Sequence, residues 1–483
     1  MSRLRAARAG AWSVGLQLIR LGVQAGVFFL FARHLPLEVI GAYSFAYAFV
    51  QLTQAFVRTG VLEVYVASER SDDQFAATAF WTSSIIGMLS AGAVFAAGLI
   101  ALALETSGAY MFFLLGVIPL IDALGVSPEA MLRKELRFAS ITLRTTVGLV
   151  IAALLCLALS YLGWGINALI SFNLSASAIS TIVSLWIVRG QLRLVGCTWA
   201  DVRGMLRTSL NVSLSTFATG VVVPASQIAL GAAAGPAAVG AFTIAHRFLG
   251  LINSVLVEPV KMAALPVLSK VRGEDERRQA MLEVVGICAA LIIPVCFSLA
   301  VIGLELLPLM LGENGAVAAP IFAILALHCV PLIISMASAQ MLLLAGRSRD
   351  ILFYTGLLSA AGIATAAACA SFGAEMTALG YVARAYALSP IALYQLLNAG
   401  GVPPTRVLRV ILMPVLPSAI MAGAVHWLLT ASQASTYVET LVTIGVAGAV
   451  GGLIYVSTLY FVARPQLTAV FRLVRSLGPA RTI

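Results

Sequence analysis

The chain has 483 residues, of which 60% are hydrophobic and only 10% are charged, and its mean hydropathy is +0.99. Soluble domains are about 45–50% apolar and about 25% charged, so this composition excludes a soluble enzyme. The net charge is +10, but the basic residues lie in short segments between apolar runs. That distribution excludes a nucleic-acid-binding surface and indicates the connections of a multi-pass membrane protein.

A spanning helix needs about 20 mostly apolar residues, and the sequence offers 14 such segments. The first one follows three arginines, as a secretory leader would, but it is too long for a leader and contains Arg20. It also lacks a small-residue cleavage site, so we expect it to remain as the first membrane helix. In chain order the expected spans are 10–34, 38–66, 75–104, 109–131, 139–162, 165–188, 205–232, 237–260, 278–304, 315–345, 350–372, 375–398, 407–430 and 437–462.

The basic residues support this order of spans. Both termini and the connections after even-numbered spans hold 23 basic residues, whereas the connections after odd-numbered spans hold Arg33 alone and six acidic residues. Because lysine and arginine favour the cytoplasmic side, both termini are expected in the cytoplasm. We therefore predict a multi-pass membrane protein whose termini both lie on the cytoplasmic side.

An internal repeat divides the spans. The segment Gly41–Ala46 opens the second span and Gly240–Ala245 opens the eighth, and each follows a proline-containing turn. The repeat unit is six helices, so the two halves share one orientation, which favours a transporter with its site between two lobes. The expected organisation is a first lobe over 1–203, a second lobe over 204–400, and two further helices with a tail over 401–483.

Cysteine and histidine give no sign of a metal site. Five of the six cysteines lie inside apolar runs, Cys197 is alone in a connection, and the sequence contains no CxxC motif and no Cys/His cluster. Neither a disulfide framework nor a bound metal is expected, and no cofactor is implied.

Four short segments, in order along the chain, match a known family pattern. Phe31–Pro36 followed by Gly41–Tyr43 is similar to the start of that pattern, although Leu35 stands where glycine is usual. The other three matches are Arg133–Phe138 before the fifth span, Gly235–Phe242 at the eighth, and Ala264–Ser269 at its close. Taken together, the chain resembles the Wzx-like oligosaccharide flippases, whose superfamily also holds the MATE exporters and the MurJ lipid II flippases.

The resemblance implies an all-α integral membrane protein with two six-helix lobes around a central cavity, working by alternating access. It implies that undecaprenyl-diphosphate-linked oligosaccharides move from the cytoplasmic to the periplasmic leaflet, for the biosynthesis of O-antigen, exopolysaccharide or capsule. It also favours a monomer in the lipid bilayer. A polymerase or ligase of the same pathway is a candidate protein partner.

Basic side chains inside the expected spans are the candidates for substrate binding. A buried arginine costs about 2.5–3.5 kcal/mol at the centre of a span, whereas a guanidinium stays charged and binds phosphate oxygens bidentately. By the resemblance, the arginines expected to face the cavity and bind the diphosphate are first Arg20, Arg58 and Arg247, then Arg384, then Arg144.

Each of these arginines also has a purely structural interpretation. Arg20 can pair with an acid on a neighbouring helix or reach the interface, and Arg58 is close enough in sequence to Glu63 for an ion pair within one lobe. Arg144 is near enough to a span end to reach the interface, and Arg384 is on a helix that can lie further out. Lys261 is expected to pair with Glu258, one turn away.

Two titratable groups are candidates for coupling to an ion gradient, namely Asp122 and His246. A carboxylate such as Asp122 more often pairs with an arginine, and His246 competes with its neighbour Arg247 for the cavity face. Tyr43 and Tyr47 are candidates for stacking on sugar rings, with core packing as the default expectation.

Two other functions remain open at this point. A MATE-like multidrug or cation antiporter shares the fold, but it needs buried carboxylates, whereas the deep charges here are mostly arginines. A membrane-bound polymerase, ligase or glycosyltransferase usually carries its acids or arginines in long outer loops, and the expected outer loops are short. An enzyme is therefore not expected.

Overall fold

The computed structural model describes residues 20–70, 72–106, 108–194, 196–259, 268, 271, 273–432 and 437–462. Within these ranges most residues are helical and none lies in a β-strand, so the expected all-α architecture is confirmed. Several predictions fall outside the described residues: those on the start of the first span, on both termini, on Lys261 and on most of the Ala264–Ser269 segment.

The helices are those of a multi-pass membrane protein. Among the described residues, nine helices are long and apolar enough to cross a membrane, or up to 11 if each of two bent pairs counts as one span. Of the other expected spans, 10–34 is described only from Arg20, whereas 38–66 and 375–398 are helical but more polar. The number of 14 spans stays a prediction.

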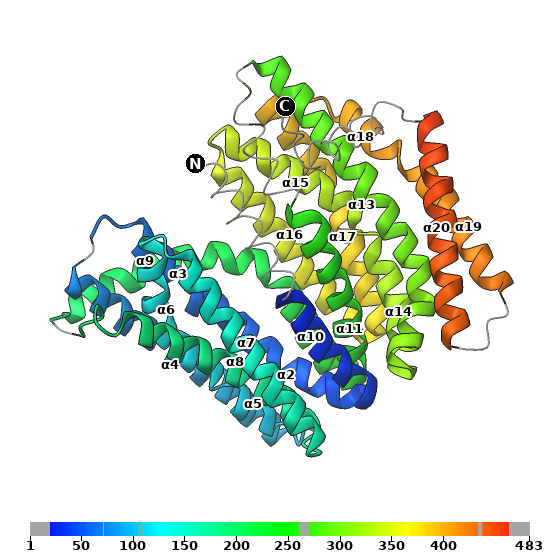
Figure 1. Cartoon of the computed structure of the whole chain (residues 1–483). Coiled ribbons are helices and arrows are strands. Elements are labelled where there is room, and N and C mark those ends of the chain that lie inside the picture. The colour runs from blue at the N-terminus through cyan, green and yellow to red at the C-terminus, as the bar shows by residue number, and fades with distance from the viewer. Residues whose placement is uncertain are drawn as a thin grey trace, which may run out of the picture. The chain divides into compact units, whose positions relative to one another are not determined.

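The chain forms two compact units, Met1–Thr243 and Ile244–Ile483. The first unit holds the helix over residues 20–34, which precedes α2, and the unit ends within α11 (Figure 1). Its labelled helices are α2 (Leu37–Arg58), α3 (Gly60–Ala67), α4 (Asp73–Ala103), α5 (Tyr110–Leu115), α6 (Ile118–Lys134), α7 (Phe138–Tyr161), α8 (Ile166–Val188), α9 (Trp199–Gly220), α10 (Val222–Ala233) and α11 (Pro236–Ile252).

The second unit begins within α11, and α13, its longest helix, packs against α14, α15 and α19. Tyr455 on α20 donates a hydrogen bond to the carbonyl of Ala290 on α13 (2.7 Å), which fixes the last helix to that core. The elements are η1 (Asn253–Val257, a π-helical turn), α13 (Glu274–Leu311), α14 (Glu313–Ala326), α15 (Cys329–Leu344), α16 (Ser348–Cys369), η2 (Ala370–Phe372), α17 (Ala374–Gly400), α18 (Pro404–Leu412), α19 (Val415–Ala431) and α20 (Tyr437–Val462).

Packing divides the chain about 40 residues after the boundary expected from the repeat. The helices α9 and α10 contact α2, and α9 also contacts α3 and α4, so residues 204–243 belong to the first compact unit. The division at 203/204 describes the repeat in the sequence rather than a packing boundary, and it stays a prediction.

The two copies of the repeated motif contact each other. A Cβ on Gly41 of α2 would lie 1.7 Å from the carbonyl oxygen of Pro236, and a Cβ on Gly240 of α11 would lie 2.5 Å from that of Leu37. Both distances are shorter than any contact a real Cβ makes, so only glycine permits this approach of the two backbones. The motif therefore has the structural role of bringing α2 and the start of α11 together.

Breaks in two helices place the polar residues of the first unit. The helix α2 ends at Arg58, Thr59 interrupts it, and α3 starts at Gly60. A cation in the last turn of a helix is favourable, because the helix dipole puts partial negative charge there. The helix α6 starts anew after Gly116, with Pro119 in its first turn, and carries Asp122 one turn later.

Candidate functional site

A polar cavity of about 250 Å³ lies in the first unit, among the helix over 20–34 and α2, α6, α7 and α8. Its charged lining consists of three arginines and two carboxylates, all on helices of one unit. The polar and charged lining residues are Arg20, Gln24, Tyr47, Gln54, Arg58, Asp122, Glu129, Arg144, Thr145, Asn173, Ser177, Ser180 and Thr181.

Asp122 and Arg58 form the central ion pair of this cavity. Nη2 and Nε of Arg58 donate to the two carboxylate oxygens of Asp122, at 2.7 and 3.0 Å. Gln54 Nε2 donates to the same carboxylate at 2.9 Å, and the hydroxyl of Ser177 on α8 also donates to it. The Asp122 side chain is 4% exposed and that of Arg58 is 55% exposed, so a buried, fully bonded carboxylate holds a half-open guanidinium.

Arg144 on α7 forms a second ion pair with Glu129 of α6. Its Nη1 also donates to the hydroxyl of Ser184 on α8 at 2.8 Å, whereas its buried Nε–H has no acceptor. Glu129 also forms an ion pair with Arg133, whose Nη2 lies 2.7 Å from Oε1 of Glu129. Arg144 is only 6% exposed and lines the cavity, so it does not reach outward to the interface.

Arg20 differs from the other two arginines of the cavity. It is exposed, and within the described part of the chain no carboxylate pairs with it. The charged groups that act on it are Arg58 and Arg144, which repel it, and Glu129, which attracts it less strongly. The lining therefore carries one positive charge more than its acids balance, and Arg20 is where that charge lies.

Aromatic and amide groups continue the lining. The rings of Tyr43 and Tyr47 on α2 stack at 5.7 Å, and Asn173 Nδ2 on α8 donates to the Tyr43 hydroxyl at 2.7 Å. Tyr43 is 1% exposed, which matches the default of core packing, whereas Tyr47 and Asn173 line the cavity. Such groups hydrogen-bond and stack on sugar rings as readily as on one another.

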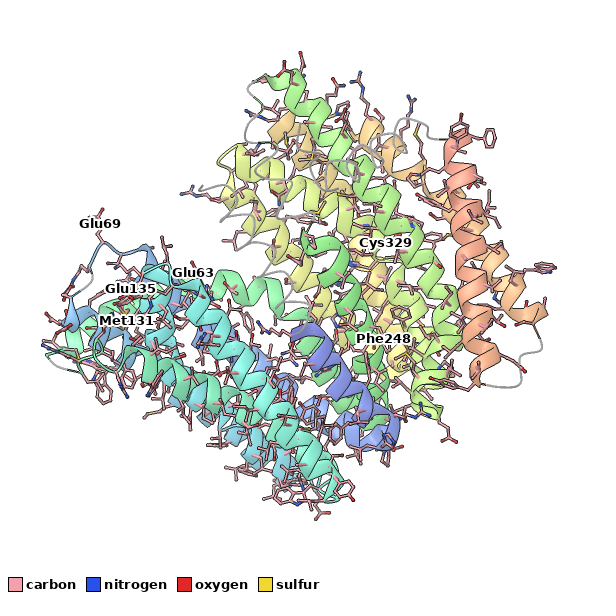
Figure 2. All side chains as sticks on the ribbon, viewed as in Figure 1. Glu63, Glu69, Met131, Glu135, Phe248 and Cys329 are labelled. Atoms are coloured by element: carbon pink, nitrogen blue, oxygen red, sulfur yellow. The ribbon has the colours of Figure 1, made fainter. Side chains whose placement is uncertain are left out.

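The structure corrects one expected pairing. The alternative that Arg58 pairs with Glu63 is wrong, because Arg58 binds Asp122 and Glu63 is exposed on α3 (Figure 2). The expectation that Asp122 pairs with an arginine is confirmed. Sequence reasoning missed Gln54 and Glu129 as lining residues, although Gln54 is four residues before Arg58 and Glu129 seven after Asp122, each on one helix face.

The remaining candidates belong to the second unit. Arg247 and His246 are half-buried on α11, and Arg384 is buried on α17 at 6% exposure. The guanidinium of Arg384 lies over the ring of Tyr381, 4.4 Å from its centre. The structure thus brings Arg20, Arg58 and Arg144 together in one cavity, while the others lie among helices of the second unit.

Comparisons with known proteins agree with this architecture. A family profile described as "Polysaccharide biosynthesis protein" matches residues 30–320. The succinoglycan biosynthesis transport protein ExoT of Rhizobium meliloti (strain 1021) is 22% identical over 475 residues, covering 97% of this chain and 95% of that protein.

Solved structures show the same fold. The lipid II flippase MurJ in an inward closed conformation superposes with a TM-score of 0.69 at 14% identity, over 94% of this chain and 98% of that one. A multidrug resistance MATE family transporter of the MOP superfamily, in an inward-facing conformation, gives a TM-score of 0.63 at 15% identity, over 79% of this chain and 95% of that one. At these identities the likeness concerns the fold alone.

Proposed function

We propose that this chain, which belongs to the polysaccharide biosynthesis protein family, moves an undecaprenyl-diphosphate-linked oligosaccharide from the cytoplasmic to the outer leaflet of the bacterial inner membrane. The observation that carries the proposal is the cavity of the first unit. Three arginines from three helices line it, only two of them are balanced by carboxylates, and sugar-compatible side chains continue the lining.

The arginines fit a lipid diphosphate. Its negative charge is the main cost of moving the headgroup through the low-dielectric core, and guanidinium groups offset that cost with charge-assisted hydrogen bonds. Arg20 pairs with no carboxylate of the described residues, and in that part of the chain the Nε–H of Arg144 has no acceptor. We assign to these two groups the first contact with the diphosphate, and to Arg58 a supporting contact through the edge that Asp122 leaves open.

Pairing of the other charges suits a carrier rather than a tight binder. Asp122 and Glu129 reduce the charge of the cavity, so the substrate meets a modest excess of positive charge that also permits release. Asp122 then has a holding role for Arg58, and proton coupling through Asp122 or His246 stays a prediction. The pH dependence of transport by Asp122→Asn and His246→Asn variants tests that prediction.

The saccharide has a natural place beside the phosphates. Tyr47, Gln54 and Asn173 line the same cavity, and together they offer an aromatic surface, donors and acceptors. We place the first sugar rings against these residues while the polyprenyl tail stays in lipid. The proposal also places both termini in the cytoplasm and assigns to Arg247 a contact with the diphosphate. The protein would move its substrate by exchanging between inward-open and outward-open states.

The charge of the cavity argues against a cation antiporter. Such a carrier needs a carboxylate that is available to a cation, whereas both lining carboxylates are held by arginines. Efflux of a cationic dye from cells expressing the protein is the direct comparison, and the proposal expects none above background.

The proposal is tested by locating the lipid-linked sugar in cells. In a strain that lacks the gene, lipid-linked oligosaccharide should accumulate and stay protected from a membrane-impermeant glycosidase added to spheroplasts. Complementation with the wild type should restore the surface polysaccharide, and Arg20→Gln should fail to do so. Arg33→Gln, an exposed arginine on the same helix, is the matched control and should restore it.

Two results would contradict the proposal. Accumulated sugar that the glycosidase cleaves lies outside already, which assigns the chain to a later step such as polymerisation or ligation. A strain that accumulates no sugar and keeps its surface polysaccharide does not depend on this chain for flipping.

A further inference from the structure

Arg384 is the centre of a second group of polar side chains, apart from the cavity described above. Its Nη1 donates to the carbonyl of Leu358 on α16 at 2.8 Å, and its guanidinium covers the ring of Tyr381 one turn earlier on α17. That ring also contacts the imidazole of His328 (5.4 Å between centres) and the imidazole of His246 on α11 (6.0 Å).

This buried arginine lacks a carboxylate. Arg384 and Arg144 are equally buried at 6% exposure, and Arg144 is paired with Glu129, but in the described part of the chain no acid pairs with Arg384. A buried charge costs several kcal/mol unless it is paired, and one carbonyl and one aromatic ring offset only part of that cost. The Nε–H of Arg384 is buried and has no acceptor at all.

The neighbours of Arg384 supply donors rather than negative charge. Tyrosine offers a hydroxyl and each histidine a ring N–H, and all of them can donate to an anion. Donors gathered around a cation that no described carboxylate balances, with one N–H without an acceptor, form an arrangement suited to binding an anion.

Room for a small ion exists next to this group. A cavity of about 200 Å³ is lined by Leu358, whose carbonyl binds Arg384, and by Ser335, Tyr354, Thr355 and Gln395. The hydroxyls of Ser335 and Tyr354 lie 3.0 Å apart and belong to the polar part of a lining that is otherwise mostly apolar. The volume suits one small ion with a few waters, whereas an oligosaccharide needs more space.

We propose that Arg384, Tyr381, His328 and His246 form a binding site in the second unit for one singly charged anion. The anion is supplied either as free chloride or as the carboxylate of an acidic sugar, and both sources offer the same chemistry to a guanidinium. The site does not depend on the proposed flippase activity, and its test measures binding alone.

Binding of radiolabelled chloride to the purified full chain in lipid nanodiscs is the first measurement, in a sodium HEPES buffer free of chloride. If the anion is chloride, wild type should bind about one chloride per chain. If the anion is a sugar carboxylate, glucuronate should raise the melting temperature of wild type at constant ionic strength. Arg384→Gln should weaken the binding of whichever anion is effective at least ten-fold. Neutral glucose should leave the melting temperature of wild type unchanged.

Two matched variants localise the binding. Arg349→Gln removes an exposed arginine of the same unit, and Arg20→Gln removes the unbalanced charge of the first unit. Both should keep the anion effect that Arg384→Gln loses. An effect that is lost in Arg20→Gln and kept in Arg384→Gln would overturn the proposal, because the anion would then occupy the other cavity.

If Arg384→Gln does not fold, wild type and Arg20→Gln decide the matter together, because an anion effect that Arg20→Gln keeps does not come from the cavity of the first unit. A melting temperature that chloride and glucuronate both leave unchanged, together with no bound chloride, means that Arg384 is only a structural group. A rise with glucuronate alone assigns the site to an acidic group of a saccharide, and a rise with chloride alone assigns it to the free ion.

Discussion

The guanidinium of Arg58 and the carboxylate of Asp122 form a two-point ion pair between α2 and α6, at 2.7 and 3.0 Å, with the acid buried and the base half open. The two partners therefore depend on each other unequally. Arg58 keeps contact with the polar cavity if Asp122 is removed, whereas Asp122 without Arg58 is a buried carboxylate with only neutral donors.

This asymmetry predicts unequal costs of substitution. Arg58→Gln should destabilise the folded protein by about 3–5 kcal/mol, the cost of breaking a buried pair from one side. Asp122→Asn should cost less, because its amide can still bind Ser177 and Arg58 keeps its exposure. The double variant should recover part of the loss of Arg58→Gln. Unfolding in detergent, followed by fluorescence, measures all three, and equal costs for the two single variants would contradict the asymmetry.

Arg20 should matter for transport and not for stability. It is exposed and has no carboxylate partner among the described residues, so Arg20→Gln should change the free energy of unfolding by no more than about 0.5 kcal/mol. A lost hydrogen bond to a charged group costs about 1.5–3 kcal/mol, which is roughly a 10- to 150-fold loss of transport. Transport that stays within two-fold of the wild type would remove Arg20 from the site.

The glycine contact between the repeated motifs should be sensitive to one added carbon. Gly41→Ala places its Cβ 1.7 Å from the Pro236 carbonyl, so the backbones must move apart. We expect a loss of about 1–3 kcal/mol of stability, typical of overpacking. Gly92→Ala on α4 is the control, because a Cβ there meets no atom within 4 Å. Similar melting temperatures for the two variants would show that the close approach is unimportant.

Membrane potential should drive transport of a diphosphate outward. Moving one charge is worth about 2.3 kcal/mol per 100 mV, so two negative charges leaving an inside-negative cell gain about 4–5 kcal/mol. Collapsing a potassium diffusion potential in proteoliposomes should therefore slow net transport. A rate that is independent of the potential would mean that the loaded carrier moves no net charge.

Composition and charge distribution were sufficient to predict the fold class. Apolar segments long enough to span a bilayer must become helices, since every backbone group has to be bonded internally. The distribution of basic residues supported the same set of spans, although α2 and α17 are more polar than the nine described helices that are apolar enough to cross a membrane. The repeat was visible in the sequence, but the close approach of Gly41 to Pro236 is a property of packing.

The pairing of charges could not be predicted. Arg58 has an acid five residues away in Glu63, but Glu63 lies on α3, beyond the break at Thr59, and the partner that Arg58 binds is 64 residues away on α6. Arg144 can be buried because Glu129 on α6 and Ser184 on α8 bind its guanidinium. No local sequence pattern reveals these partners on two other helices. The isolation of Arg384 from every described acid is likewise a property of packing.

Purified protein in liposomes tests the central claim most directly. Lipid-linked oligosaccharide extracted from the deletion strain is placed in both leaflets of the liposomes, and a glycosidase added outside reports how much becomes accessible with time. We expect wild type to make nearly all of it accessible, Arg33→Gln to do so at a similar rate, and Arg20→Gln to expose the inner half about 10- to 150-fold more slowly. Wild-type liposomes in which only the outer half is ever cleaved would contradict the central claim.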